Sequence, residues 1–145
     1  MSQNKLSLWV HLVWGVKKRK NLITDEVRPI LYNKILEVSD FKGYGVVEIN
    51  GMPDHVHLLL QLNPKYSISE IVKNLKGATS TWLAQQNITD EYFEWQDGYG
   101  AFSVSSFMVE TVKRYIRNQE EHHADKDFAN EIIYLDGLVK SFDRK

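Results

Sequence analysis

The chain has 145 residues, of which 43% are hydrophobic and 26% charged, and its formal net charge is −1. Such a composition is ordinary for a soluble protein, and the length favours one domain over residues 1–145. The lack of cysteine excludes disulfides, thiolate catalysis and cysteine-bound metals. The first residues form neither a signal peptide nor a membrane span, so we expect a cytoplasmic protein without membrane contact.

The first half of the chain predicts a strand, a helix and a hairpin. Residues 6–14 are rich in strand-forming side chains, and a basic loop follows at 15–24. Apolar residues at helical spacing predict a helix over 25–39, which Thr24 or Asp25 can cap. Residues 44–50 and 54–62 read as two strands joined by a tight connection, which predicts an antiparallel hairpin.

The second half adds two helices and a further strand. Ser67 or Ser69 can begin a helix that reaches about residue 86. Residues 91–104 look like short strand pieces broken by glycine, a helix follows from 105 or 106 to about 122, and 127–140 can form a last helix. The order β-α-β-β-α-β-α predicts an α+β fold of ferredoxin-like or RNA-recognition-like plan: an antiparallel sheet with helices packed on one face.

Two histidines on the predicted strand 54–62 are candidates for metal binding. His55 and His57 are separated by one residue, so both side chains point to the same face of a strand. That spacing allows two imidazoles to bind one metal ion. By itself the pair is weak evidence, because two histidines on the exposed face of a half-buried strand give the same pattern.

A second set of candidates lies on the predicted helix 105–122. Tyr115 and Gln119 are four residues apart and therefore share one face of that helix. If this face covers the histidine pair, Gln119 can supply a third metal ligand and Tyr115 can act on a bound phosphodiester. An alternative is that Tyr115 is a surface tyrosine and that Gln119 is solvated.

Four segments together resemble the single-tyrosine HUH transposases of small bacterial and archaeal insertion sequences, which include the REP-associated tyrosine transposases. They are His11–Trp14, Met52–Leu59, Trp95–Ser105 and Tyr115–Gln119. Each is weak alone, but their order and spacing are specific. The resemblance extends over nearly the whole chain.

The resemblance implies roles for four residues. His55, His57 and Gln119 would bind Mg²⁺ or Mn²⁺, and Tyr115, on a C-terminal helix, would be the catalytic nucleophile. The implied reaction cleaves and rejoins single-stranded DNA at hairpin-bearing ends through a 5′-phosphotyrosine. The family is dimeric, so a homodimer is expected, and the tyrosine helix of one subunit can complete the site of its partner.

Two other functions are compatible with the same residues. One is a single-stranded nucleic-acid-binding protein that descends from such a transposase and no longer cuts DNA. The other is a metal-dependent phosphodiesterase that uses water, with Tyr115 as a structural residue. A covalent protein–DNA adduct distinguishes the transposase from both.

Charge and the neighbours of these residues leave some roles open. A net charge of −1 argues mildly against nucleic-acid binding, but Lys17–Lys20 form a basic cluster that can contact phosphates or simply lie in solvent. Asp54 can orient one of the histidines or cap the hairpin turn. His11 is more typical of a structural residue than of a ligand. His122 and His123 could approach the site, although a solvated helix end is the commoner case.

Overall fold

The computed structural model describes residues 4–119. Its strands are β1 (Trp9–Gly15), β2 (Val46–Met52), β3 (His55–Gln61) and β4 (Gly100–Val104). Its α-helices are α1 (Val27–Lys42), α2 (Ile68–Gln85) and α3 (Val109–Arg117), with short 3-10 helices η1 (Lys17–Arg19) and η2 (Ser106–Met108). The helix expected at 127–140, the end of the helix expected at 105–122, and His122 and His123 lie outside the described residues.

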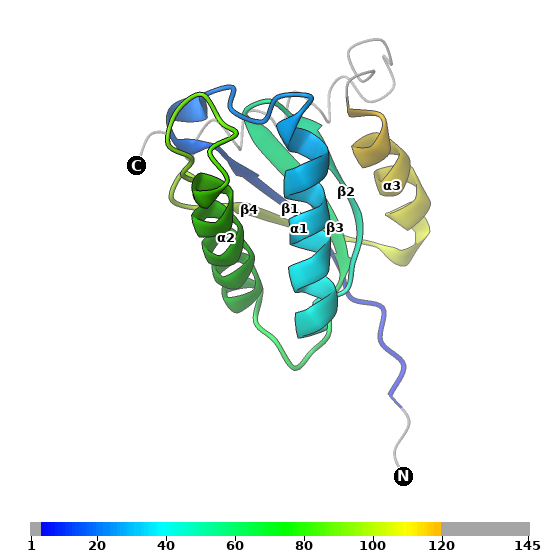
Figure 1. The fold of residues 1–145 in the computed structure, drawn as a ribbon. Helices are drawn as coiled ribbons and strands as arrows, with labels where there is room; N and C mark the ends of the chain where they lie inside the picture. Colours follow the sequence, from blue (N-terminus) through cyan, green and yellow to red (C-terminus); the bar gives the residue numbers. More distant parts are fainter. Residues whose placement is uncertain (1–3, 120–145) are drawn as a thin grey trace.

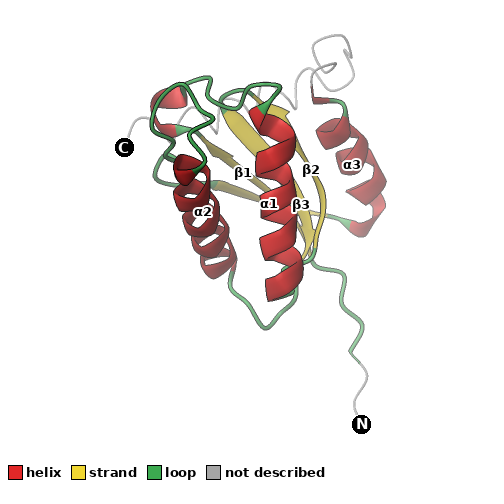
Figure 2. Cartoon of the chain, in the orientation of Figure 1, coloured by secondary structure: helices red, strands yellow, loops and turns green. Residues whose placement is uncertain are grey.

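The strands form one antiparallel sheet in the order β2-β3-β1-β4. Helices α1 and α2 lie side by side against one face, and α3 packs against the other (Figure 1 and Figure 2). The predicted α+β antiparallel fold and its element order are confirmed, and the expectation that helices pack on one face holds for α1 and α2 but not for α3. Because β1 and β3 are buried along nearly their whole lengths, both faces of the sheet centre need a cover, and α3 provides the second one.

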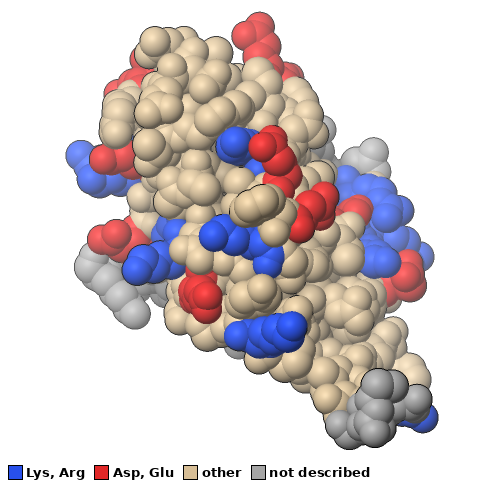
Figure 3. Space-filling view, turned by 60° about the horizontal axis from the view of Figure 1, so that its bottom comes forward, with Lys and Arg blue, Asp and Glu red and all other residues tan. Residues whose placement is uncertain are grey.

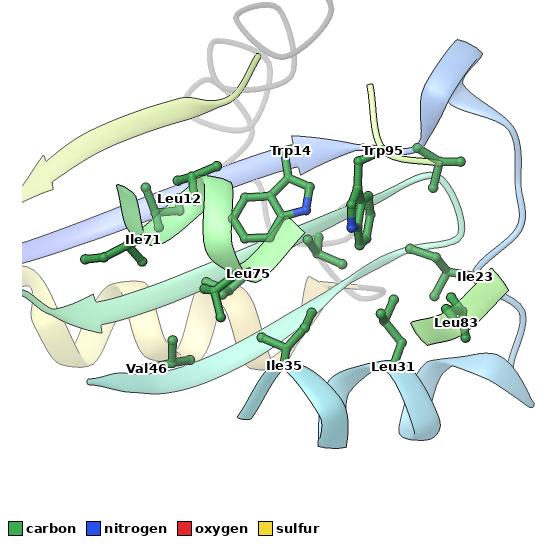
Figure 4. Packing of buried hydrophobic residues seen from close by; sticks show 14 of the residues in the cluster. Leu12, Trp14, Ile23, Leu31, Ile35, Val46, Ile71, Leu75, Leu83 and Trp95 are labelled. Carbon is green, nitrogen blue, oxygen red and sulfur yellow. The ribbon is translucent and has the colours of Figure 1, made fainter. Parts of the chain in front are cut away.

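The main core lies between the sheet and helices α1 and α2. Figure 4 shows Trp14 of β1 beside Trp95, with Leu31 and Ile35 of α1 and Leu75 of α2 facing them. The rings of Trp14 and Trp95 meet edge to face, with centroids 5.9 Å apart. Each of these large apolar side chains stabilises the fold by about 1.5–3 kcal/mol when it leaves water.

Local signals fix the ends of α1 and α2. The Ser67 hydroxyl accepts a hydrogen bond from the backbone N–H of Glu70 at 3.1 Å, so Ser67 rather than Ser69 caps α2. Helix α1 continues to Lys42, beyond the predicted end at 39, and stops at Gly43. Gly43 has a φ of 76°, a left-handed conformation in which glycine ends helices at little steric cost.

The segment before α3 departs most from the prediction. Of residues 91–104, only Gly100–Val104 form a strand, while Trp95 makes a single bridge to Val16. The remainder is a loop tied to α2, because the Lys76 ammonium donates to the backbone oxygens of Gln96 and Gly98. Helix α3 begins at Val109 instead of 105 or 106, since the 3-10 turn η2 occupies the intervening residues.

The surface mixes charges of both signs. On the face shown in Figure 3, lysine and arginine side chains are interspersed with aspartate and glutamate. Exposed ion pairs such as Lys17–Glu94 and Lys20–Glu91 contribute to this mixture. Among residues 4–119, no helix is both long enough and apolar enough to span a bilayer.

Candidate active site

The sheet face beneath α3 carries both histidines of the hairpin. His55 pairs with Gly15 across β3 and β1, and His57 pairs with Val13. Directly paired residues of antiparallel strands point to the same face. The imidazoles of His55 and His57 therefore share this face, and their ring centroids are 5.0 Å apart. Both residues are buried.

His11 of β1 holds His57. Its Nε2 lies 2.8 Å from His57 Nδ1. Burial lowers the pKa of His11 from 6.5 to about 4, so this ring is neutral at pH 7. When His11 Nε2 is the acceptor of this contact, His57 carries its proton on Nδ1. Through this contact His11 holds the ring of His57 in place.

Asp54 holds His55. The His55 Nδ1 donates to Asp54 Oδ1 at 2.7 Å, and Arg19 Nε donates to Asp54 Oδ2 at 3.0 Å. Burial alone would raise the pKa of Asp54, but the hydrogen bond from His55 and the positive charge of Arg19 outweigh it, and the pKa falls below its usual value. Asp54 therefore orients an imidazole, which was one of its two predicted roles.

Arg19 comes from the basic cluster, although its side chain turns inward. The residue has a φ of 54°, an unusual conformation for any residue with a side chain. Besides binding Asp54, its Nη2 lies 3.3 Å from His55 Nδ1. The Nδ1 proton of His55 points to the closer carboxylate of Asp54. The longer contact with Arg19 is therefore not a further hydrogen bond, and it places a positive charge beside the imidazole. No local pattern in the sequence indicates this role.

Tyr115 lies over the histidines of its own chain. Its ring centroid is 5.8 Å from that of His57 and 6.0 Å from that of His11. Tyr115 packs in a small apolar cluster with Leu59 of β3 and with Ile116 of α3. The interpretation of Tyr115 as a surface tyrosine is wrong, because only 4% of the residue is exposed.

Gln119 lies just beyond the end of α3 and is also buried, so it is not a solvated residue. The end of α3 is held against β2 by two hydrogen bonds. Asn50 Nδ2 donates to the backbone oxygen of Arg117 at 2.8 Å, and Arg117 Nε donates to Glu48 Oε1 at 2.8 Å. Asn50 is the cross-strand partner of His57. The two bonds therefore hold Arg117, two residues before Gln119, close to His57.

The polar atoms at this face fit a divalent metal ion. His55 Nε2 and Gln119 Oε1 are buried without a hydrogen-bond partner among the described residues. Such atoms are costly unless a ligand engages them. Protein hydrogen bonds occupy Nδ1 of both histidines, so each ring would bind metal through Nε2, the usual arrangement of metal-bound histidine. Within residues 4–119, no three His, Asp or Glu side chains form a metal cluster, so a third ligand from this part of the chain would be of another type.

The buried His11 makes the stability of the metal-free protein depend on pH. Because the folded pKa of about 4 lies below the value of 6.5 for a free histidine, the unfolded chain takes up the proton first, and stability falls as the pH decreases from 6.5 towards 4. At 1.36 kcal/mol per pH unit the loss approaches about 3 kcal/mol. Urea unfolding in chelator at pH 7 and pH 4.5 measures it, with His11→Gln as a control that cannot titrate. Equal pH sensitivity of the two proteins would contradict the assignment.

Comparison with known proteins places the chain in a family. The family model described as "Transposase IS200 like" matches residues 4–119. The ISDra2 transposase TnpA of Deinococcus radiodurans is 31% identical over 116 residues, which cover 77% of this chain and 83% of that protein. The transposase for insertion sequence element IS200 of Salmonella typhimurium is 27% identical over 128 residues, covering 86% of this chain and 82% of the relative.

Solved structures agree with this placement. A crystal structure described as a transposase from Deinococcus radiodurans R1 matches with a TM-score of 0.64 and 29% identity, covering 82% of this chain and 98% of that one. A REP-associated tyrosine transposase bound to a REP hairpin matches with a TM-score of 0.61 over 85% of this chain and 74% of that one, and at 13% identity it shares the fold. The protein described here belongs to the IS200-like transposase family.

Proposed function

We propose that this transposase cleaves and rejoins single-stranded DNA through a covalent 5′-phosphotyrosine on Tyr115, assisted by Mg²⁺ or Mn²⁺. The observation that carries the proposal is the position of Tyr115, buried against His57 on the sheet face that also carries His55, whose Nε2 has no hydrogen-bond partner among residues 4–119. A tyrosine beside two oriented imidazoles suits metal-assisted phosphoryl transfer to a side chain.

His55, His57 and Gln119 would hold the ion, and two hydrogen-bonded pairs would orient the rings. His11 fixes His57, and Asp54 with Arg19 fixes His55. When bound, a divalent ion polarises the phosphodiester and stabilises charge on the departing oxygen. The chain's own contribution would be to set the tautomers of His55 and His57 and to exclude water from their rings.

The reaction exchanges one phosphodiester for another. Tyr115 Oη attacks the phosphorus and loses its proton, the bond from phosphorus to the 3′ oxygen breaks, and that oxygen gains a proton to become a 3′-hydroxyl. The phosphate remains linked to the 5′ end of the other strand through Tyr115. A later attack by a 3′-hydroxyl restores the phenol and rejoins DNA. Because no phosphodiester is lost, the cycle needs no ATP, and the sequence contains no phosphate-binding loop of the Gly-x-x-x-x-Gly-Lys type.

Hairpin-bearing single strands are the proposed substrate. The solved REP-associated relative is bound to a REP hairpin, and this chain shares its fold. On the surface shown in Figure 3, lysine and arginine side chains are interspersed with acidic ones, so surface charge does not by itself indicate DNA binding.

The experiment is a denaturing gel with labelled single-stranded DNA that carries the hairpins flanking the chain's own gene. With Mg²⁺ or Mn²⁺ we expect a covalent protein–DNA band that is absent in chelator and absent for Tyr115→Phe. Cleavage without a covalent band would favour the water-using phosphodiesterase. Tight binding without cleavage would favour the DNA-binding descendant.

We further propose that the active species is a homodimer with shared sites. Helix α3 follows β4 through the short segment Ser105–Met108, so α3 of a second copy could make the contacts that α3 makes here. Mixing Tyr115→Phe with His57→Ala chains should then restore cleavage, because one site of the mixed dimer has both intact residues. If the mixture stays inactive although mixed dimers form, each chain uses its own tyrosine, and the sharing proposal is wrong.

A further inference from the structure

Gln96 reaches the histidine face from the loop before β4. Its neighbour Trp95 points into the main core and donates from Nε1 to Thr79 Oγ1 at 3.0 Å. In an extended segment successive side chains alternate between faces, so Gln96 points to the opposite side of the sheet. A Cβ atom built on Gly15 would lie 3.0 Å from Gln96 Oε1, which places the amide directly over Gly15.

This position is next to His55. Gly15 is the cross-strand partner of His55, so the space above Gly15 and the His55 imidazole belong to the same face. The side chain of Arg19, which contacts His55, borders the same space, with its Cδ 3.1 Å from the built Cβ. The absence of a side chain at residue 15 is therefore what leaves room for the Gln96 amide beside His55.

The Gln96 amide is buried with nothing in the described chain to bind. The residue is only 6% exposed, yet neither Nε2 nor Oε1 has a hydrogen-bond partner among residues 4–119. A buried amide left in this state destabilises a protein, which makes it a candidate for contact with a ligand. The backbone of Gln96 is independently secured, because its N–H donates to Gly15 O at 3.0 Å and its carbonyl accepts from Lys76 Nζ at 2.6 Å.

The pair of atoms left without partners indicates the chemistry of the ligand. A phosphate offers only acceptors, so it could satisfy Nε2 and would leave Oε1 unpaired. The edge of a nucleobase presents a donor and an acceptor side by side, and glutamine binds such edges with two hydrogen bonds. A base of a single strand is accessible for this contact because it is not paired.

We propose that Gln96 reads the edge of one base of the DNA strand beside the phosphodiester held at His55 and His57. The inference rests on the proposed function, because it places DNA on the histidine face. Gln96 is then a specificity-determining residue of that site. It selects sequence near the cleaved bond, while the histidines and Tyr115 act on the backbone, which is the same for every sequence.

The test uses the full chain and a single-stranded DNA library in which a hairpin from beside its own gene is flanked by randomised segments. Strands retained under native conditions are sequenced separately from strands that become covalently attached. For the wild type we expect a preferred base at one position near the cleaved bond. Gln96→Ala should lower that preference roughly tenfold and leave preferences at other positions unchanged. Gln96→Glu keeps the shape but has only acceptors, so the preferred base should shift towards cytosine, whose amino group donates.

Two further variants separate recognition from folding. Gly15→Ala retains Gln96 but crowds its amide, so it should weaken the same base preference; the atoms it meets belong to the side chains of Gln96 and Arg19 and not to the backbone, so the fold should persist. Gln85→Ala, at the exposed end of α2, is the matched control and should behave as wild type. Thermal unfolding confirms that each variant is folded.

The outcomes are distinct. Identical base preferences for wild type and Gln96→Ala, or an equal loss of binding for every sequence, would overturn the role of Gln96. A wild type without any base preference near the hairpin would overturn it too. The absence of covalently attached strands would contradict the proposed function alone, since the retained strands still report on Gln96.

Discussion

Replacing His57 with alanine is expected to lower both Mn²⁺ affinity and single-strand cleavage by more than a hundredfold. Loss of an outer partner of a metal-bound histidine typically costs 10–100-fold, and loss of the ligand itself should cost more. The substitution also removes the partner of His11 at 2.8 Å. Isothermal titration with Mn²⁺ and the rate of adduct formation measure the two effects.

His11→Gln is the comparison that separates ligand from positioning residue. It leaves His57 in place and keeps polar atoms beside it, so Mn²⁺ affinity should fall only about 10–100-fold. Both variants should remain folded at 25 °C, as checked by circular dichroism. If His57→Ala bound Mn²⁺ as tightly as wild type, the histidine pair would not be the metal site. If His11→Gln had no effect on affinity, the hydrogen bond to His57 would have no role in orienting it.

Gly51→Ala is expected to destabilise the protein by about 3 kcal/mol or more, the range of substitutions that force a backbone clash. A Cβ on Gly51 would overlap the backbone oxygen of His55 and lie 2.8 Å from Val56 Cα. Neither obstacle is a flexible side-chain end, so β2 or β3 would have to move. Since β3 carries both histidines, metal binding should weaken along with stability. Urea unfolding and Mn²⁺ titration measure these changes.

Gly77→Ala is the control for this effect. Gly77 lies within α2, and nothing stands within 4 Å of a built Cβ. Alanine favours the helix over glycine, so this variant should be more stable by about 0.5–1 kcal/mol. A Gly51→Ala protein as stable as wild type would show that the hairpin tolerates wider strand separation than the structure has.

The sequence was sufficient for the fold because its signals are local. The hairpin pattern, the Ser67 cap and helical spacing in α1 and α2 each depend on neighbouring residues, and all are confirmed. Of the short strand pieces predicted within 91–104, only Gly100–Val104 forms a strand, because Trp95 is held in the core by Thr79 and the Lys76 ammonium binds the adjacent carbonyls. Those contacts join residues distant in sequence, which no local pattern reveals.

The candidate site was predictable in part for the same reason. The spacing of His55 and His57 within one strand, and the four-residue separation of Tyr115 and Gln119, can be read from sequence, although Gln119 lies just beyond the end of α3. The positioning roles of His11 and Arg19 cannot, because they depend on the register of β1 with β3 and on the left-handed conformation of Arg19. Gln96 was named only as part of a motif, since its position over Gly15 follows from the loop conformation.

Identifying the residue that carries DNA in the covalent intermediate tests the central claim most directly. The adduct formed with Mn²⁺ would be digested with protease and nuclease, and the modified peptide located by mass spectrometry. We predict a nucleotide linked through its 5′ phosphate to Tyr115, together with a released strand whose 3′ end a polymerase can extend. A nucleotide on any other residue, or cleavage products with no modified peptide, would contradict transesterification through Tyr115.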